Sequence, residues 1–212
     1  MRLRLTFSKA GALRYTGHLD LQRIWERACR RADLPLSYSH GFHPQARISM
    51  AAALPLGFLG QAELVDLYLE QDLPEPEVLN RLQASLPPGM EVSSAEAIAV
   101  QQPALQTQVL SAKYEVQFLD PVDRATISPG ITRLLAATSI PRVRREREYD
   151  LRPLIESLAI KDKIDDDQVI LTMQLAASPS RTGRPEEVLA ELGIEPVPTR
   201  ITRTALLLKP GD

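Results

Sequence analysis

Hydrophobic and polar residues alternate along several short segments of the chain, which is the pattern of a half-buried β-strand. The first such segment runs from Arg2 to Ser8, where Leu3, Leu5 and Phe7 alternate with polar side chains. Further strands or strand-like runs are predicted over residues 36–39, 47–51, 63–70, 90–98, 114–118, 169–175 and 199–208. The pattern therefore predicts a protein with a large proportion of β-structure.

Other segments repeat apolar residues every three or four positions, as one face of an α-helix does. The clearest helix is predicted over residues 18–32, with Gly17 as its N-cap and Leu34-Pro35 after its end. Its apolar stripe contains Leu21, Ile24, Trp25, Ala28 and Ala32, and its other side carries Arg23, Arg27, Arg30 and Arg31. Shorter helices are predicted after Pro74, from Ser128-Pro129 onward and over residues 185–192.

The first half of the chain thus runs strand, helix, strand, strand, helix, strand, which is the order of a ferredoxin-like βαββαβ unit. The second half repeats this order. Residues 101–108 are polar, neutral and contain a proline, as a linker between domains often does. We therefore expect an α+β fold of two tandem ferredoxin-like units, at residues 1–100 and 113–212, joined by a linker over 101–112.

Two charged runs stand out in the second half. Residues 142–149 form an extended, arginine-rich run, which is either a solvated edge strand or the extension of a groove between the two units. The three aspartates at 165–167 are expected in a solvated hairpin turn and not at a metal site.

Composition places the chain among ordinary globular proteins, with 44% hydrophobic and 25% charged residues in 212. There is no apolar run long enough to span a bilayer, and the N-terminus lacks the apolar core of a signal peptide, so we expect a cytoplasmic protein without membrane contact. The single cysteine, Cys29, can form neither an internal disulfide nor an iron–sulfur cluster, and we expect a buried, unreactive thiol. No metal or cofactor is expected.

The charge is unevenly distributed. Residues 1–50 contain nine Lys and Arg against three Asp and Glu, a balance of +6, whereas the whole chain carries −2. The remaining residues must therefore carry −8. A local basic surface of this kind suits a polyanion such as RNA, although a helix face of moderate charge is often merely solvated.

The loop after the basic helix adds aromatic and imidazole groups. Gly41 and Pro44 favour an ordered reversal from which His40, Phe42 and His43 project, with the whole loop forming one wall of a pocket beside the helix. Exposed aromatic rings can stack on bases, and arginines can neutralise phosphates. The RNA-binding candidates are Arg14, Arg23, Arg27, Arg30, Arg31, Tyr38, His40, Phe42, His43 and Arg47.

The histidines leave other interpretations open. His40 and His43 could act as general base and acid in metal-independent RNA cleavage, with Arg47 stabilising the phosphorane. They could also bind zinc, but a structural zinc site needs four ligands. Motifs for nucleotide hydrolysis, dinucleotide binding or zinc-protease activity are absent from the sequence.

Three motifs in this region resemble a known family. They are R-Y-x-x-H-L-D-L-x-R from Arg14, R-R-A-x-L-P-L-x-Y-S-x-G-F-x-P from Arg30, and R-I-S-x-A-x-x-L-P-L-G from Arg47. The pattern resembles a bacterial family of uncharacterised proteins that are encoded beside, or fused to, a radical SAM protein. This resemblance implies a radical SAM partner and supplies no activity of its own.

We therefore hypothesise an accessory module that binds structured RNA, such as tRNA or rRNA, and presents it to a radical SAM modification enzyme. One alternative is a metal-independent endoribonuclease that uses His40 or His43. Another is a scaffold that docks the radical SAM partner without touching RNA. No DNA specificity is inferred.

Overall fold

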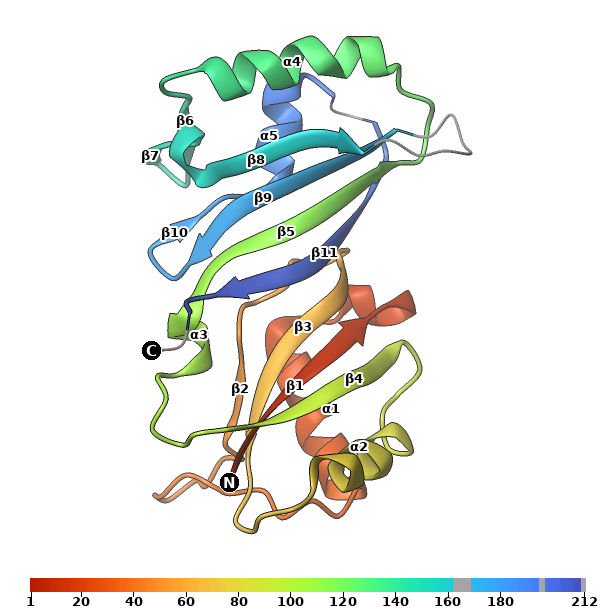
Figure 1. Ribbon diagram of the computed structural model, residues 1–212, viewed down its shortest axis with the longest axis vertical. Coiled ribbons are helices and arrows are strands. Elements are labelled where there is room, and N and C mark those ends of the chain that lie inside the picture. Colours follow the sequence, from red (N-terminus) through yellow and green to blue (C-terminus); the bar gives the residue numbers. More distant parts are fainter. Residues whose placement is uncertain (162–168, 195–196, 211–212) are drawn as a thin grey trace. The chain divides into compact units, whose positions relative to one another are not determined.

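The computed structural model describes residues 1–161, 169–194 and 197–210, and the chain divides into two compact units (Figure 1). Unit 1 is Met1–Val109 and unit 2 is Leu110–Asp212. Both contain helices and antiparallel strands, so the prediction of a mixed α+β protein is confirmed. Among the described helices, none combines the length and the apolar content needed to cross a lipid bilayer.

Unit 1 contains a four-stranded antiparallel sheet in the order β4-β1-β3-β2. Its elements are β1 (Arg2–Lys9), the 3-10 helix η1 (Gly11–Tyr15), α1 (His18–Arg31), β2 (Ile48–Met50), β3 (Leu59–Tyr68), α2 (Glu75–Gln83), β4 (Met90–Ile98) and α3 (Leu105–Gln108). The helix α1 joins β1 to β2, and α2 joins β3 to β4, so each helix lies between strands that are not neighbours in the sheet.

One face of this sheet packs against α1 and α2 (Figure 1). Leu3 of β1 pairs in register with Leu67 of β3, and both are completely buried. Trp25 of α1 meets the ring of Phe7 edge-on, with ring centroids 5.0 Å apart. Because aromatic pairs prefer this T-shaped geometry, the contact fixes α1 against the sheet and leaves the opposite side of the helix free.

The other face of the sheet is also covered in its centre, contrary to the half-exposed strand that the sequence predicts. Arg2 and Asp66 are 1% and 0% exposed. The Arg2 guanidinium donates to Asp66 Oδ2 and to the main-chain oxygens of Gln102 and Pro103, while Arg4 donates to both oxygens of Asp66. The two arginines thus share one buried carboxylate and anchor part of the segment predicted as a linker.

Unit 2 has strands in the order β8-β9-β5-β11, with the short β10 also paired to β9. Its elements are β5 (Val109–Phe118), α4 (Arg124–Ala136), β6 (Pro141–Arg144), β7 (Arg147–Asp150), the 3-10 helix η2 (Arg152–Leu154), β8 (Ile155–Lys161), β9 (Ile170–Ser178), β10 (Arg181–Thr182), α5 (Pro185–Leu192) and β11 (Thr199–Leu208). Val116, Leu171 and Val188 from β5, β9 and α5 are completely buried.

The helix α4 begins earlier than the sequence predicts. Its N-cap is Asp123, whose side chain accepts a hydrogen bond of 2.8 Å from the Ala125 amide. The helix therefore starts at Arg124, and Pro129 lies inside it, where it can make no amide hydrogen bond. Proline was a misleading start signal because a capping aspartate lies six residues before it.

The arginine-rich run of residues 142–149 is also different from the single extended segment that the sequence predicts. It forms a hairpin, in which β6 and β7 pair antiparallel and turn at Arg145-Glu146. The aspartates at 165–167, predicted in a hairpin turn, lie outside the described residues.

Candidate nucleic-acid interface

The basic side of α1 faces solvent as its periodicity predicts. Arg23, Arg27 and Arg30 are exposed, while Leu21 and Trp25 on the other side are buried. Arg23 donates to Asp20 at 3.1 Å, an exposed pair between neighbouring turns that adds little stability. For Arg27 and Arg30, the described part of the chain provides no hydrogen-bond or ion-pair partner.

Arg31 stands apart from this group, because it donates to the main-chain oxygen of Ser85 at 3.0 Å. Arg14 and Arg47 are likewise engaged by their own surroundings. Arg14 lies over the ring of Tyr15 and donates to its hydroxyl at 2.7 Å, and Arg47 stacks on Tyr68 at 4.2 Å from the ring centroid. These contacts orient both guanidiniums and leave donor groups available.

The segment after α1 is a closed loop. Tyr38 forms an isolated bridge with Ala46, and the Ser39 amide donates to the Gln45 carbonyl at 2.9 Å. The Ser39 hydroxyl accepts from the Gln45 amide, so the ends of the loop are tied twice. Gly41 has φ +137°, a conformation that a side chain would disfavour. Residues 38–45 are all exposed, so the loop lies away from the core.

The tip carries Phe42 fully exposed, and Tyr38 is 45% exposed. A phenylalanine without any burial gains nothing from the fold, so its ring is available to a partner. His40 and His43 are exposed on either side of Phe42, and the described residues contain no hydrogen-bond partner that would orient either imidazole. Within the same residues, no group of three or more potential metal ligands comes together.

A groove of about 270 Å³ lies between α1 and the end of this loop. Its walls are formed by Leu19, Gln22, Arg23 and Glu26 from α1 and by Pro44, Gln45, Ala46 and Ile48 from the loop and β2. The predicted pocket beside the helix is therefore present, but Pro44 is the part of the histidine loop that lines it. His40, Phe42, His43 and Arg47 lie outside its lining.

Cys29 is completely buried on the core side of α1. Burial raises the pKa of its thiol to about 12, so the thiolate is scarce at neutral pH. The sequence predicts a buried, unreactive cysteine, and the burial of Cys29 and its raised pKa agree with that prediction.

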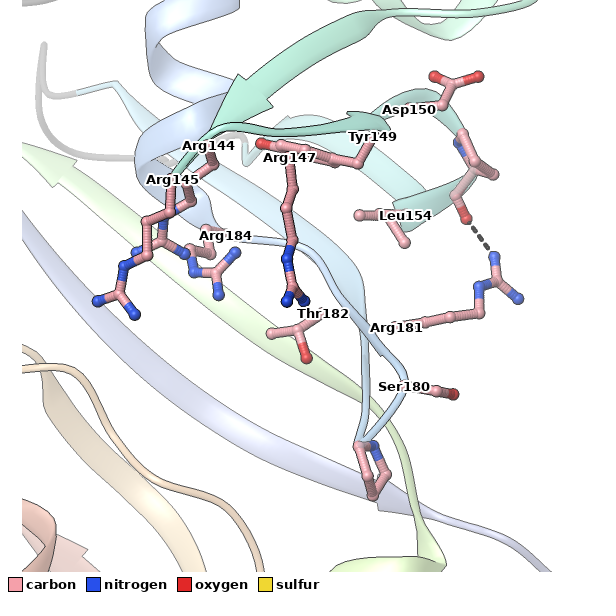
Figure 2. Close-up of a pocket in the computed structure, with 12 residues that line it drawn as sticks. Arg144, Arg145, Arg147, Tyr149, Asp150, Leu154, Ser180, Arg181, Thr182 and Arg184 are labelled. Atoms are coloured by element: carbon pink, nitrogen blue, oxygen red, sulfur yellow. Dashed lines mark hydrogen bonds between the residues drawn. The ribbon is translucent and has the colours of Figure 1, made fainter.

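A second basic site lies within unit 2 and is larger. A pocket of about 890 Å³ is lined by five arginines from the β6–β7 hairpin and from the segment around β10 (Figure 2). The sequence signals part of it through the arginine-rich run at residues 142–149. Arg181 and Arg184 gave no signal, because only the fold brings them to the hairpin.

A family model described as "Uncharacterized protein conserved in bacteria (DUF2344)" matches residues 2–185. The chain belongs to this family. The resemblance to a bacterial family of uncharacterised proteins is thereby confirmed, and the match to DUF2344 carries no link to radical SAM proteins. No curated protein matches the chain.

Solved structures resemble the chain in fold. One is the crystal structure of a Cbf5–Nop10–Gar1 complex, with a TM-score of 0.53 and 9% identity over 99% of this chain and 50% of the other. The archaeal box H/ACA sRNP Nop10–Cbf5 complex gives a TM-score of 0.48 and 10% identity over 99% and 49%. The DUF2344 chain therefore spans about half the length of these chains, and the first likeness bears on the fold alone.

Proposed function

We propose that unit 1 binds RNA through the basic side of α1 and the loop of residues 38–46. The observation that carries this proposal is the groove where the two meet, which brings Arg23 of α1 beside Pro44 at the base of the exposed loop. Arg27 and Arg30 follow Arg23 along the exposed side of α1, and the fully exposed ring of Phe42 belongs to the loop that forms the other wall of the groove.

The chemistry of these groups suits single-stranded or looped RNA. Arg27 and Arg30 can neutralise phosphates without first giving up an ion pair, and Phe42 and Tyr38 can stack on unpaired bases. Both kinds of contact tolerate many sequences, so we expect recognition of shape and of unpaired bases in preference to a defined sequence.

We further propose that the protein acts in the cytoplasm and presents this RNA to a radical SAM enzyme. The resemblance in the motifs from Arg14, Arg30 and Arg47 supports this partner. We also propose that the two units are separate ferredoxin-like domains, because β4-β1-β3-β2 in unit 1 and β11-β5-β9-β8 in unit 2 follow the same order of strands along the chain and across the sheet.

The test is a fluorescence titration of total tRNA and of rRNA fragments over a range of salt concentrations. Arg27→Glu with Arg30→Glu should lower the affinity by an order of magnitude or more and should make the slope of log affinity against log salt shallower by about 2. Arg200→Glu with Lys209→Glu, in exposed positions of unit 2, makes the same change in net charge and should have a much smaller effect.

Three outcomes would contradict the proposal. They are absence of binding at low salt, an equal loss in both charge-reversal variants, and formation of the radical SAM complex with no contribution from RNA, which would favour the scaffold. Metal-independent RNA cleavage that is abolished by His43→Ala would replace binding by the endoribonuclease function.

A further inference from the structure

The arginine-lined pocket of unit 2 lies where three segments meet. They are the β6–β7 hairpin, residues 153–154 of η2, and the segment that runs from Pro179 through β10 to Arg184 at the start of α5 (Figure 2). All three belong to unit 2, so the pocket is complete within one compact unit. It shares no residue with the surface that we propose for RNA.

Positive charge in this pocket is not balanced by the residues that line it. Arg144, Arg145, Arg147, Arg181 and Arg184 face a single acidic side chain, Asp150. That carboxylate is engaged elsewhere, because its Oδ1 accepts the Ile140 amide at 2.8 Å and the Arg152 amide at 2.9 Å. These main-chain bonds stabilise the charged form and lower its pKa.

Four of the five guanidiniums also lack a protein partner among the described residues. Arg181 donates to the Pro153 carbonyl at 2.8 Å, whereas Arg144, Arg145, Arg147 and Arg184 have no hydrogen-bond or ion-pair partner among the described residues. Figure 2 shows the Arg147 side chain reaching down from the hairpin toward Thr182, with Arg184 beside it. Arginines that gather without carboxylates repel one another, and a bound anion would remove that repulsion.

The neighbouring Arg142, in contrast to the pocket arginines, is paired with carboxylates. It lies two residues before Arg144 on the same strand and donates to Glu187 at 3.0 Å and to Glu191 at 2.6 Å. Burial alone would lower the pKa of this guanidinium, but its hydrogen bonds to Glu187 and Glu191 outweigh that effect and raise the pKa. Arg142, outside the pocket, is therefore paired with two carboxylates, whereas none of the five pocket arginines has a carboxylate partner among the described residues.

Two local features of the β6–β7 hairpin are unfavourable in free energy. Arg145 and Glu146 have φ +48° and +64°, so both positions of the turn are left-handed, where Asn-Gly is the favoured sequence. Arg144 and Arg147 also stand directly opposite each other across the strands, which is unfavourable for like charges. Strained backbone that presents a set of unpaired charges is typical of a binding site.

We propose that this pocket binds a nucleotide through two or more adjacent phosphates. Its volume of about 890 Å³ is large enough for a ligand of that size. Guanidiniums match phosphate oxygens in planar, bidentate pairs, and the Ser180 hydroxyl can add a hydrogen bond, whereas the Thr182 hydroxyl already donates to the Ser178 carbonyl. Tyr149 and Leu154 supply the apolar surface on which a base or sugar can rest. The phosphates belong either to a free nucleoside polyphosphate or to the 5′ end of an RNA strand.

Isothermal titration calorimetry tests the proposal with pyrophosphate, a nucleoside triphosphate, the matching monophosphate, and one RNA oligonucleotide with and without a 5′-triphosphate. We expect the triphosphate to bind more tightly than the monophosphate and the affinity to fall with salt. Arg147→Gln with Arg184→Gln should weaken binding at least tenfold and leave the melting temperature of the free protein within a few degrees of the original.

The matched control is Arg133→Gln with Arg200→Gln, which removes two arginines of unit 2 outside the pocket and should leave the affinity unchanged. Binding of the free triphosphate would assign the pocket to a soluble nucleotide, and binding of only the 5′-triphosphate RNA would assign it to an RNA end. If no polyphosphate binds at millimolar concentration, or if the pocket and control variants bind equally well, the proposal is wrong. Arg27→Glu with Arg30→Glu in unit 1 should not alter binding of pyrophosphate or of the free triphosphate, so failure here is distinguishable from failure of the RNA proposal.

Discussion

Two groups of arginines in this protein have opposite surroundings. In unit 1, Arg2 and Arg4 share the buried carboxylate of Asp66, and every contact is between 2.6 and 3.1 Å. In unit 2, four of the five arginines around the pocket have no partner in the described part of the chain. The residue type is the same, but two arginines share one carboxylate in unit 1, whereas the five pocket arginines have one carboxylate in their lining, Asp150, which accepts from main-chain amides.

The difference separates arginines that stabilise the fold from arginines that are available to a ligand. A buried guanidinium must be paired, because an unpaired charge in a low dielectric costs several kcal/mol. An exposed guanidinium can remain unpaired at small cost, since water solvates it. Changes at Asp66 should therefore affect stability, and changes in the pocket should affect binding.

The largest effect is expected at Asp66. Asp66→Asn keeps the shape of the side chain but leaves two buried or half-buried guanidiniums without a counter-charge, so we expect a loss of about 3–5 kcal/mol in the free energy of unfolding. Urea unfolding followed by circular dichroism measures it. Asp72→Asn is the control, because Asp72 is exposed and should change the stability by less than about 0.5 kcal/mol. Equal effects at both positions would remove the distinction between the two groups.

The next largest effect on stability is expected at Arg142, which we compare with Arg144 on the same strand. Arg142→Gln breaks the bonds to Glu187 and Glu191, which are partly exposed, and should cost about 1–2 kcal/mol. Arg144→Gln removes a like charge opposite Arg147 and should change stability by less than about 0.5 kcal/mol, in the stabilising direction. Thermal and urea unfolding of the two variants measure the difference. A double-mutant cycle with Glu191→Gln checks that the Arg142 effect comes from this pair.

The sequence predicted the elements that depend on short-range patterns. The helix α1 ends within one residue of its predicted boundary, and β4, α5 and β11 have the predicted bounds. Each of these combines a clear period with a capping or breaking residue, as at Gly17 before α1 and Gly193 after α5. Gly193 has φ +71°, the left-handed conformation that commonly ends a helix.

The features that were missed depend on partners far along the chain or on unusual local chemistry. The burial of Arg2 requires Asp66 and the carbonyl oxygens of residues 102–103, and no local pattern contains that information. The hairpin turn lacks the glycine or asparagine that normally marks one. The pocket requires Arg181 and Arg184 to meet that hairpin, so sequence alone could indicate a basic segment but not a site.

The smallest expected effect concerns Asp150, the single carboxylate that lines the pocket. Its hydrogen bonds from the Ile140 and Arg152 amides lower its pKa below the ordinary 3.8, so the charged form is favoured in the folded state. This stabilisation is present above the unfolded pKa and is lost as the pH falls through the lower folded value. Asp150→Asn should therefore be slightly less stable than the original protein near pH 7, and their unfolding free energies should converge below about pH 4.

If Asp150 instead neutralised the pocket arginines, the same substitution would strengthen pyrophosphate binding substantially. We expect only a modest increase, because the carboxylate already accepts from the Ile140 and Arg152 amides, and titration calorimetry of the Asn variant at neutral pH distinguishes the two cases.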